Sequence, residues 1–146
     1  MVLRTLCGEG DADFVACVSQ SLNPQQLFMV GLRDLDAAEQ QFIQEHSIYH
    51  TPGIDLSALV QAIQQKGYSR VYVHFDVDGL NPEIFPCMSY PTDGGLTVEQ
   101  ISEMITTLDQ NFEIVGMSLT EYASETGEGV ELLDPILIQA AAIVKA

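Results

Sequence analysis

The chain is poor in basic residues. Among its 146 residues are 5 Lys and Arg against 21 Asp and Glu, a formal net charge of −16. Nucleic acids and anionic membrane surfaces bind proteins through clusters of Lys and Arg, so the composition argues against both as partners. It suits a protein that attracts cations, such as metal ions or cationic small molecules, although acidity alone also serves solubility.

Cysteines and long hydrophobic runs are also few. There are three cysteines, Cys7, Cys17 and Cys87. Their number is odd, their spacing matches no zinc-binding motif, and no secretory leader precedes them, so we expect reduced thiols in a cytoplasmic protein. No apolar run reaches the roughly 20 residues of a membrane-spanning helix. Repeats, low-complexity tracts and an evident linker are absent as well, and the length predicts a single domain over residues 1–146.

Helical patterns alternate with short apolar runs along the chain. Capping boxes at Asp36–Glu39 and Thr97–Gln100 mark two helix starts. We expect helices over residues 11–21, 36–46, 55–66, 97–108 and 134–144, and strands over residues 26–31, 47–49, 70–76 and 113–119. Strands separated by helices predict an α/β fold, with a parallel sheet between helices on both faces in three layers.

Two carboxylates close the apolar run V-Y-V-H-F-D-V-D-G. On an alternating strand, Asp76 and Asp78 share one side with His74, and the other side is apolar. Glu121 ends the next predicted strand. Ligands bind at the carboxyl ends of strands in such sheets, and unpaired buried carboxylates are costly. The pattern therefore predicts that these carboxylates converge on a hard divalent cation such as Mg²⁺ or Mn²⁺.

Two other kinds of site also use paired acidic residues. A calcium-binding EF-hand loop is excluded by spacing, because Gly79 comes two residues too early and Cys87 stands at the twelfth position. A phosphohydrolase of the haloacid dehalogenase type also places D-x-D-G after an apolar strand, with Asp76 as nucleophile and Asp78 as acid. That family adds a downstream lysine, and the only lysine after Asp78 is Lys145 at the tail. This phosphohydrolase remains an alternative.

Several ordered motifs together resemble the arginase/agmatinase (ureohydrolase) family. The segment F-D-V-D-G-L-N-P, followed by a proline-containing loop and G-G-L-T, resembles the family's S-F-D-[VIL]-D-x-L-D-P and G-G-L-[ST] signature. V-G-L-R-D-L-D-A-A-E at residues 30–39 resembles its I-G-x-R-x-x-D-x-x-E segment. Residues 118–124 resemble the strand that ends in a substrate-facing Glu. The resemblance extends over nearly the whole chain and matches the C-terminal half of such a domain.

The resemblance implies a hydrolase acting on C–N bonds of guanidino compounds. Asp76 and Asp78 match two ligands of the family's binuclear Mn²⁺ centre, and Glu121 matches the carboxylate that faces the guanidinium group. In the family the two metals lower the pKa of a bridging water, whose hydroxide attacks the guanidinium carbon and releases urea. His74 and Tyr90 are weaker candidates for lining the site.

The family's upstream G-G-D-H and D-A-H-x-D ligand motifs do not occur in this chain. We therefore expect an arginase-like fragment that is inactive alone and binds Mn²⁺ weakly at most. Asn81 and Tyr90 depart from the family pattern, which leaves the guanidino substrate open. A non-catalytic binding or scaffold role is a further alternative. Half of a parallel sheet exposes an unpaired edge, from which we expect a homo-oligomer.

Overall fold

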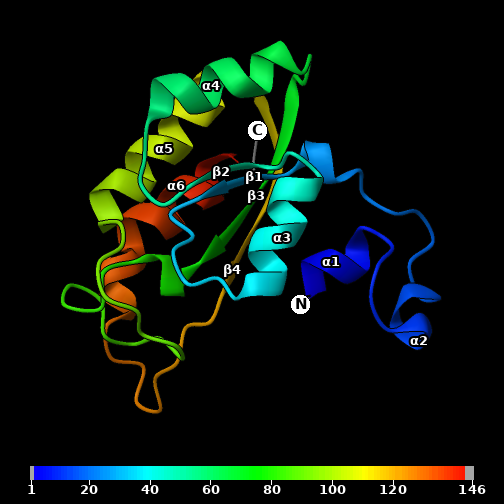
Figure 1. Cartoon of the computed structure of the whole chain (residues 1–146). Coiled ribbons are helices and arrows are strands. Elements are labelled where there is room, and N and C mark those ends of the chain that lie inside the picture. Colours follow the sequence, from blue (N-terminus) through cyan, green and yellow to red (C-terminus); the bar gives the residue numbers. More distant parts are fainter. Residues whose placement is uncertain (1, 144–146) are drawn as a thin grey trace. The chain divides into compact units, whose positions relative to one another are not determined.

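The computed structural model describes residues 2–143, in which helices and strands alternate (Figure 1). The α-helices are α1 Val2–Leu6, α2 Ala12–Val15, α3 Ala37–Glu45, α4 Leu56–Gln65, α5 Val98–Asn111 and α6 Asp134–Ile143. The strands are β1 Phe28–Val30, β2 Tyr49–Thr51, β3 Arg70–Asp76 and β4 Glu113–Thr120. Short 3₁₀ turns are η1 Pro24–Gln26, η2 Val77–Gly79 and η3 Val130–Leu133. This alternation confirms the predicted α/β class.

Backbone contacts divide the chain into two compact units. The first contains residues up to 29 together with Leu35–His50, and the second contains Val30–Asp34 and everything from Thr51 onward. Strands β3 and β4 are parallel neighbours, and β1 pairs with β2. The described strands thus form two sheets of two strands each, where the sequence suggested a single parallel sheet.

The second unit is built around the parallel pair β3–β4 and helix α5. Helix α5 contacts β4, α4 and α6. Its apolar stripe is buried, and Ile105 has no exposed surface. On β3, Val73 and Phe75 are buried while Tyr72 and His74 are exposed, which is the predicted alternation. One face of this strand therefore enters the core, and the polar face leads to Asp76.

Local capping chemistry fixes the starts of the main helices as predicted. The Asp36 and Thr97 side chains accept hydrogen bonds from the third amides of α3 and α5. The side chains of Glu39 and Gln100 in turn accept from the backbone amides of the two cap residues, so both capping boxes form. Asp55 caps α4 by accepting from the amide of Ala58. These caps set the ends of the helices that frame the sheet strands.

The predicted helix over residues 11–21 is wrong beyond its first turn. It ends at Val15. The amide of Ala16 still bonds four residues back, but those of Cys17 and Val18 bond three residues back. Phe14 is 69% exposed, so the segment has no buried apolar face to stabilise a longer helix.

Two other boundaries shift. Ser47 adopts a left-handed φ of 51°, and the amide of Ile48 bonds back to Ile43, so the chain turns out of α3 before β2 begins at Tyr49. Asp134, expected as a cap, is the first residue of α6. Val144, the predicted end of that helix, lies outside the described residues.

The first unit contains an ion-pair cluster centred on Glu9. Its carboxylate lies 3.1 Å from Arg4 and 3.0 Å from the His46 ring. The Arg4 guanidinium lies over the Phe42 ring at 5.6 Å, and this ring is buried. The cluster fastens α1 to the end of α3.

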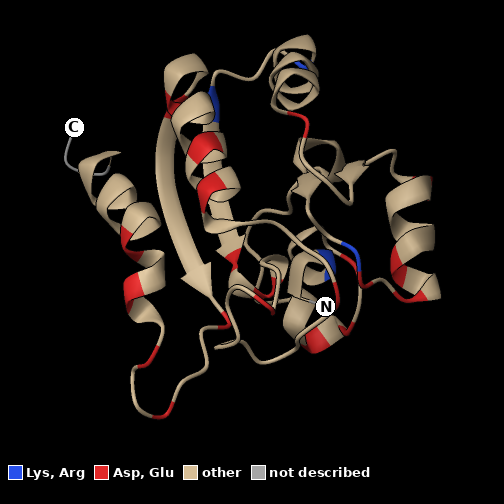
Figure 2. Ribbon diagram, turned by 90° about the vertical axis from the view of Figure 1, so that its left-hand side faces the viewer, with Lys and Arg blue, Asp and Glu red and all other residues tan. Residues whose placement is uncertain are grey.

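Asp and Glu residues are spread along helices and loops, while Lys and Arg residues are few (Figure 2). Within residues 2–143, no helix has the length and apolar character needed to cross a membrane.

Candidate functional site

Asp76 stands where β3 passes into the 3₁₀ turn η2. Its Oδ1 accepts the amide of Asp78 at 2.9 Å, which caps this turn. Val77, between the two carboxylates, is completely buried. Asp76 and Asp78 on either side of it are only partly buried, so the apolar residue of D-V-D enters the core and the two carboxylates stay accessible.

Asp78 lies in surroundings that shift its pKa upward. Partial burial raises its pKa, and the neighbouring charges of Asp76 and Glu121 raise it further. Hydrogen bonds from backbone amides, including that of Tyr90 at 3.4 Å, act in the opposite direction. Asp76 at the end of β3 and Glu121 after β4 thus both act on the pKa of Asp78, and the convergence of the three carboxylates on a cation stays a prediction.

Glu121 follows β4 with an unusual backbone conformation. Its φ is 64°, in the left-handed region that a non-glycine residue seldom adopts. The residues after it are tied down: Tyr122 pairs with Met88 in an antiparallel bridge, and its hydroxyl donates to the Glu128 carbonyl at 2.8 Å. Surrounding structure therefore holds Glu121 in a strained conformation, and such strain is concentrated at functional sites.

The proline-containing segment over residues 79–95 is closed and packed. Its ends meet where the amide of Leu96 donates to the Gly79 carbonyl at 3.0 Å, and Leu80 and Leu96 form a parallel bridge. Gly95 makes this closure possible, because its φ is 112° and a Cβ there would lie 2.6 Å from the Leu80 carbonyl oxygen. Phe85, inside the loop, is fully buried. The segment is thus a compact Ω-like loop.

Arg33 binds this loop, a role that was not predicted from the sequence. Its guanidinium donates to five backbone carbonyls, those of Gly31 (3.4 Å), Gly79 (3.3 Å), Leu80 (3.0 Å), Thr92 (2.6 Å) and Asp93 (3.1 Å). The motif V-G-L-R was noted only as part of a resemblance. A lone arginine beside a left-handed glycine gives no sequence signal of which carbonyls it reaches.

The two weaker candidates make different contacts. His74 lies on the exposed side of β3, with its Nδ1 2.7 Å from the Ser118 hydroxyl on the paired strand. Tyr90 reaches the site through its backbone amide, and its side chain is 74% exposed. His74 is therefore engaged by β4, two residues before the carboxylates, and Tyr90 supplies a main-chain donor.

The type of donor atom at this site suits a metal ion, but the number of donors is too small to hold one. Carboxylate oxygens are the donors that Mn²⁺ prefers. Within residues 2–143, however, no group of three or more His, Cys, Asp or Glu side chains is arranged to hold a metal ion. An octahedral ion needs about six donors, and Asp76 and Asp78 supply a minority of them. The residues fit a share of a manganese site and do not complete one.

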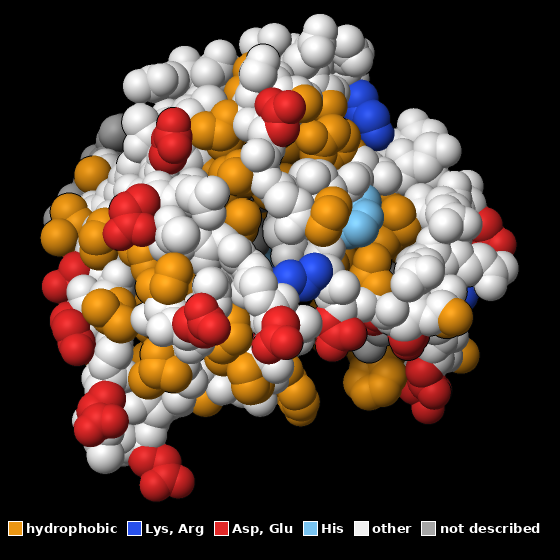
Figure 3. Space-filling view, turned by 60° about the vertical axis from the view of Figure 1, so that its left-hand side comes forward, with side chains coloured by type: hydrophobic (Ala, Val, Ile, Leu, Met, Phe, Trp, Pro, Cys, Tyr) orange, Lys and Arg blue, Asp and Glu red, His pale blue; other side chains and the backbone are white. Residues whose placement is uncertain are grey.

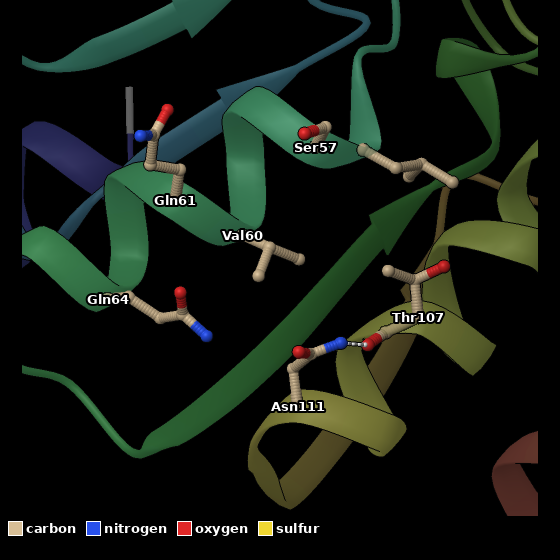
Figure 4. A pocket seen from close by; sticks show the side chains of 7 residues that line it. Ser57, Val60, Gln61, Gln64, Thr107 and Asn111 are labelled. Atoms are coloured by element: carbon tan, nitrogen blue, oxygen red, sulfur yellow. Dashed lines mark hydrogen bonds between the residues drawn. The ribbon is translucent and has the colours of Figure 1, made fainter.

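A separate hollow of about 450 Å³ lies between α4 and α5 (Figure 4). Amide, hydroxyl and aliphatic side chains line it: Leu56, Ser57, Val60, Gln61, Gln64, Thr107 and Asn111. Asn111 donates to the Thr107 carbonyl at 2.8 Å within this wall. Because no titratable side chain faces it, the hollow offers no acid–base chemistry.

Comparison with known sequences points to one family. A family model described as the arginase family matches residues 3–135. The arginase of Staphylococcus aureus strain MRSA252 is 29% identical over 130 residues, which are 83% of this chain and 43% of that protein. The arginase of Coccidioides posadasii strain C735 is 28% identical over 107 residues, covering 68% of this chain and 33% of that protein. The chain thus spans less than half the length of these relatives.

Solved structures agree on the fold. The Entamoeba histolytica arginase in complex with L-ornithine superposes with a TM-score of 0.81 at 20% identity, covering 100% of this chain and 51% of that one. The native arginase of Bacillus caldovelox gives 0.79 at 20% identity, covering 99% and 52%. These matches confirm a partial arginase-like fold and lend no support to the phosphohydrolase alternative. The chain belongs to the arginase family.

Proposed function

We propose that this chain carries part of a ureohydrolase site, one that hydrolyses the C–N bond of a guanidino compound. The observation that supports it is the position of Asp76 and Asp78 at the end of β3, beside the paired strand β4 after which Glu121 follows and raises the pKa of Asp78. Carboxylates placed close enough to perturb one another are typical of sites that bind a cation. Membership of the arginase family supports the same assignment.

Each carboxylate has a distinct role in this proposal. Asp76 and Asp78 would donate oxygen ligands to Mn²⁺, whose chemistry in such sites is the activation of water near neutral pH. Glu121 would bind the guanidinium group, because a carboxylate can accept two parallel hydrogen bonds from it. The fixed left-handed backbone at Glu121 orients this side chain before a ligand arrives.

The chain by itself should lack activity. The G-G-D-H and D-A-H-x-D motifs that supply the other ligands in the family are not in the sequence, and two carboxylates leave most of an octahedral shell to water. We therefore propose weak Mn²⁺ binding and no urea release from the isolated chain.

A titration of Mn²⁺, followed by the loss of its free-ion electron paramagnetic resonance signal, tests the ligand assignment. The double variant Asp76→Asn, Asp78→Asn should lose the binding that the wild-type chain has. Asp109→Asn on the exposed side of α5 is the control, since it removes one carboxylate remote from the site. Unchanged binding in the double variant would overturn the assignment.

Urea measurement after incubation with Mn²⁺ and arginine or agmatine tests the activity itself. No urea above a metal-only blank is expected. Sustained urea release by the pure chain would overturn the proposed inactivity. A chain that binds neither Mn²⁺ nor guanidino compounds would favour the non-catalytic scaffold role instead.

We further propose that the chain forms a homo-oligomer in a cytoplasmic setting. Apolar side chains of η3 and α6 are exposed, with Ile138 at 70% and Leu137 at 39%. One face of the molecule shows hydrophobic side chains between acidic ones (Figure 3). Strands β3 and β4 pair only with each other among the described residues, and unpaired edges promote association. A monomer in light scattering would contradict the oligomer.

Free thiols at Cys7, Cys17 and Cys87 suit a reducing compartment, which supports the cytoplasmic setting.

A further inference from the structure

Arg33 is a cation that binds backbone carbonyls in a strongly acidic chain. Among the described residues, the ion pairs formed by arginine side chains involve Arg4 and Arg70 and do not include Arg33. The guanidinium is half-buried and uses Nε, Nη1 and Nη2 as donors to main-chain oxygens. Hydrogen bonds from a charged donor are stronger than neutral ones. The hydrogen bonds of Arg33 thus serve to hold a backbone segment in position.

The carbonyls that Arg33 binds flank the contact between Asp78 and Tyr90. Gly79 and Leu80 come directly after Asp78, and Thr92 and Asp93 come two and three residues after Tyr90. One side chain therefore holds together two stretches of chain that are also linked by the Tyr90 amide, which donates to the Asp78 carboxylate.

The segment that carries Arg33 is itself fixed against the loop. Gly31 has a left-handed φ of 77°, and a Cβ at this position would lie 3.0 Å from the Leu96 side chain. Residues 30–34 belong to the second compact unit, although the sequence on both sides belongs to the first. A close approach of backbone to Leu96 brings the guanidinium to the point where the loop closes.

We propose that Arg33 is a positioning residue, which locks the closed 79–96 loop and so fixes where Asp78 presents its carboxylate. The metal-dependent part of this inference rests on the proposed function, while the effect on the loop does not. Lysine cannot replace Arg33 in this role. The planar guanidinium of arginine donates in several directions and reaches carbonyls on both sides of the loop, whereas lysine has a single ammonium group on a flexible stem.

Amide hydrogen exchange of the metal-free chain, measured by NMR, tests the loop. In Arg33→Lys, the amides of Asn81 and Leu96, which bond across the closure, should exchange about tenfold faster or more. The amide of Phe112, bonded to Leu108 at the end of α5, reports on the core and should keep its protection. Arg70→Lys is the matched control, since Arg70 is 66% exposed in a surface ion pair with Glu113.

Unchanged exchange at Asn81 and Leu96 in Arg33→Lys would overturn the proposal. Equal acceleration at Phe112 would also count against it, because Arg33 would then support the whole unit. Gly95→Ala provides a second route: it opens the same closure without touching Arg33 and should give the same pattern, and a protected loop in that variant would refute the closure itself.

A second readout separates positioning from general support. The dissociation constant for Mn²⁺ should rise in Arg33→Lys and stay unchanged in Arg70→Lys. An unchanged constant in Arg33→Lys, with wild-type binding present, would overturn the link between the loop and Asp78. If the wild-type chain binds no Mn²⁺, the proposed function fails, and hydrogen exchange still decides whether Arg33 locks the loop.

Discussion

Replacing Phe85 with alanine should destabilise the second unit strongly, although Phe85 lies in a segment that is neither helix nor strand. Its side chain is completely buried, its ring centroid lies 6.2 Å from that of Tyr122, and one ring atom lies 3.8 Å from where a Cβ on Gly129 would stand. Loss of a buried phenylalanine leaves a cavity and costs about 3–5 kcal/mol. That is a large share of the roughly 5–15 kcal/mol by which domains are stable.

Urea denaturation followed by far-UV circular dichroism measures this cost. Tyr90→Ala, in the same loop, is the matched control: the tyrosine side chain is 74% exposed, and its loss should change the unfolding free energy by about 0.5 kcal/mol or less. A cost below about 1 kcal/mol for Phe85→Ala would refute the description of residues 79–96 as part of the core. The site would then rest on a loosely held loop.

Three further predictions follow from single contacts. Burial raises the pKa of Asp78 in the folded chain above its ordinary value of 3.8. The stability that protonated Asp78 contributes is therefore present below pH 3.8 and is lost as the pH rises through the raised pKa. Asp78→Asn should have a higher urea midpoint than the wild-type chain at pH 7, and this difference should shrink below pH 3.8. Gly95→Ala should lower the thermal midpoint, whereas Gly53→Ala, which meets no atom within 4 Å, should leave it nearly unchanged; equal midpoints would contradict the steric argument. Glu9→Gln should cost less than about 1 kcal/mol in urea denaturation, because the Arg4, His46 and Glu9 side chains are 32–39% exposed and such ion pairs are weak; a cost of several kcal/mol would contradict this.

Local signals predicted the frame of the second unit well. The stripe that includes Leu59 and Ile63 and the capping box at Thr97 identify α4 and α5, and the alternation along residues 70–76 identifies β3 with its observed bounds. Hydrophobic periodicity and capping depend on neighbours within one or two turns, so they can be read from the sequence alone. The convergence of Asp78 and Glu121 on one site is expected from parallel strands that end at one edge, and it stays a prediction.

Features that depend on distant residues could not be predicted in the same way. The helix proposed over residues 11–21 lacked a burying partner for Phe14, and the sequence does not reveal whether such a partner exists. The five carbonyls bound by Arg33 are up to 60 positions away along the chain. The metal and substrate roles of Asp76, Asp78 and Glu121 also remain predictions, because they concern ligands rather than packing.

The pairing of β3 with β4 has a consequence for how the acidic cluster arises during folding. Asp78 and Glu121 follow two strands that α5 connects in one β–α–β unit, with Asp76 opposite Thr120 in the register. The paired residues, from Arg70 with Glu113 to Asp76 with Thr120, are far apart in the sequence, so the segment that contains α5 must close before the strands can pair. Asp76 and Glu121 therefore reach the ends of paired strands only when this unit folds, and any repulsion between the acidic groups of the site is a cost that the packing of α5 on β4 must offset at that stage.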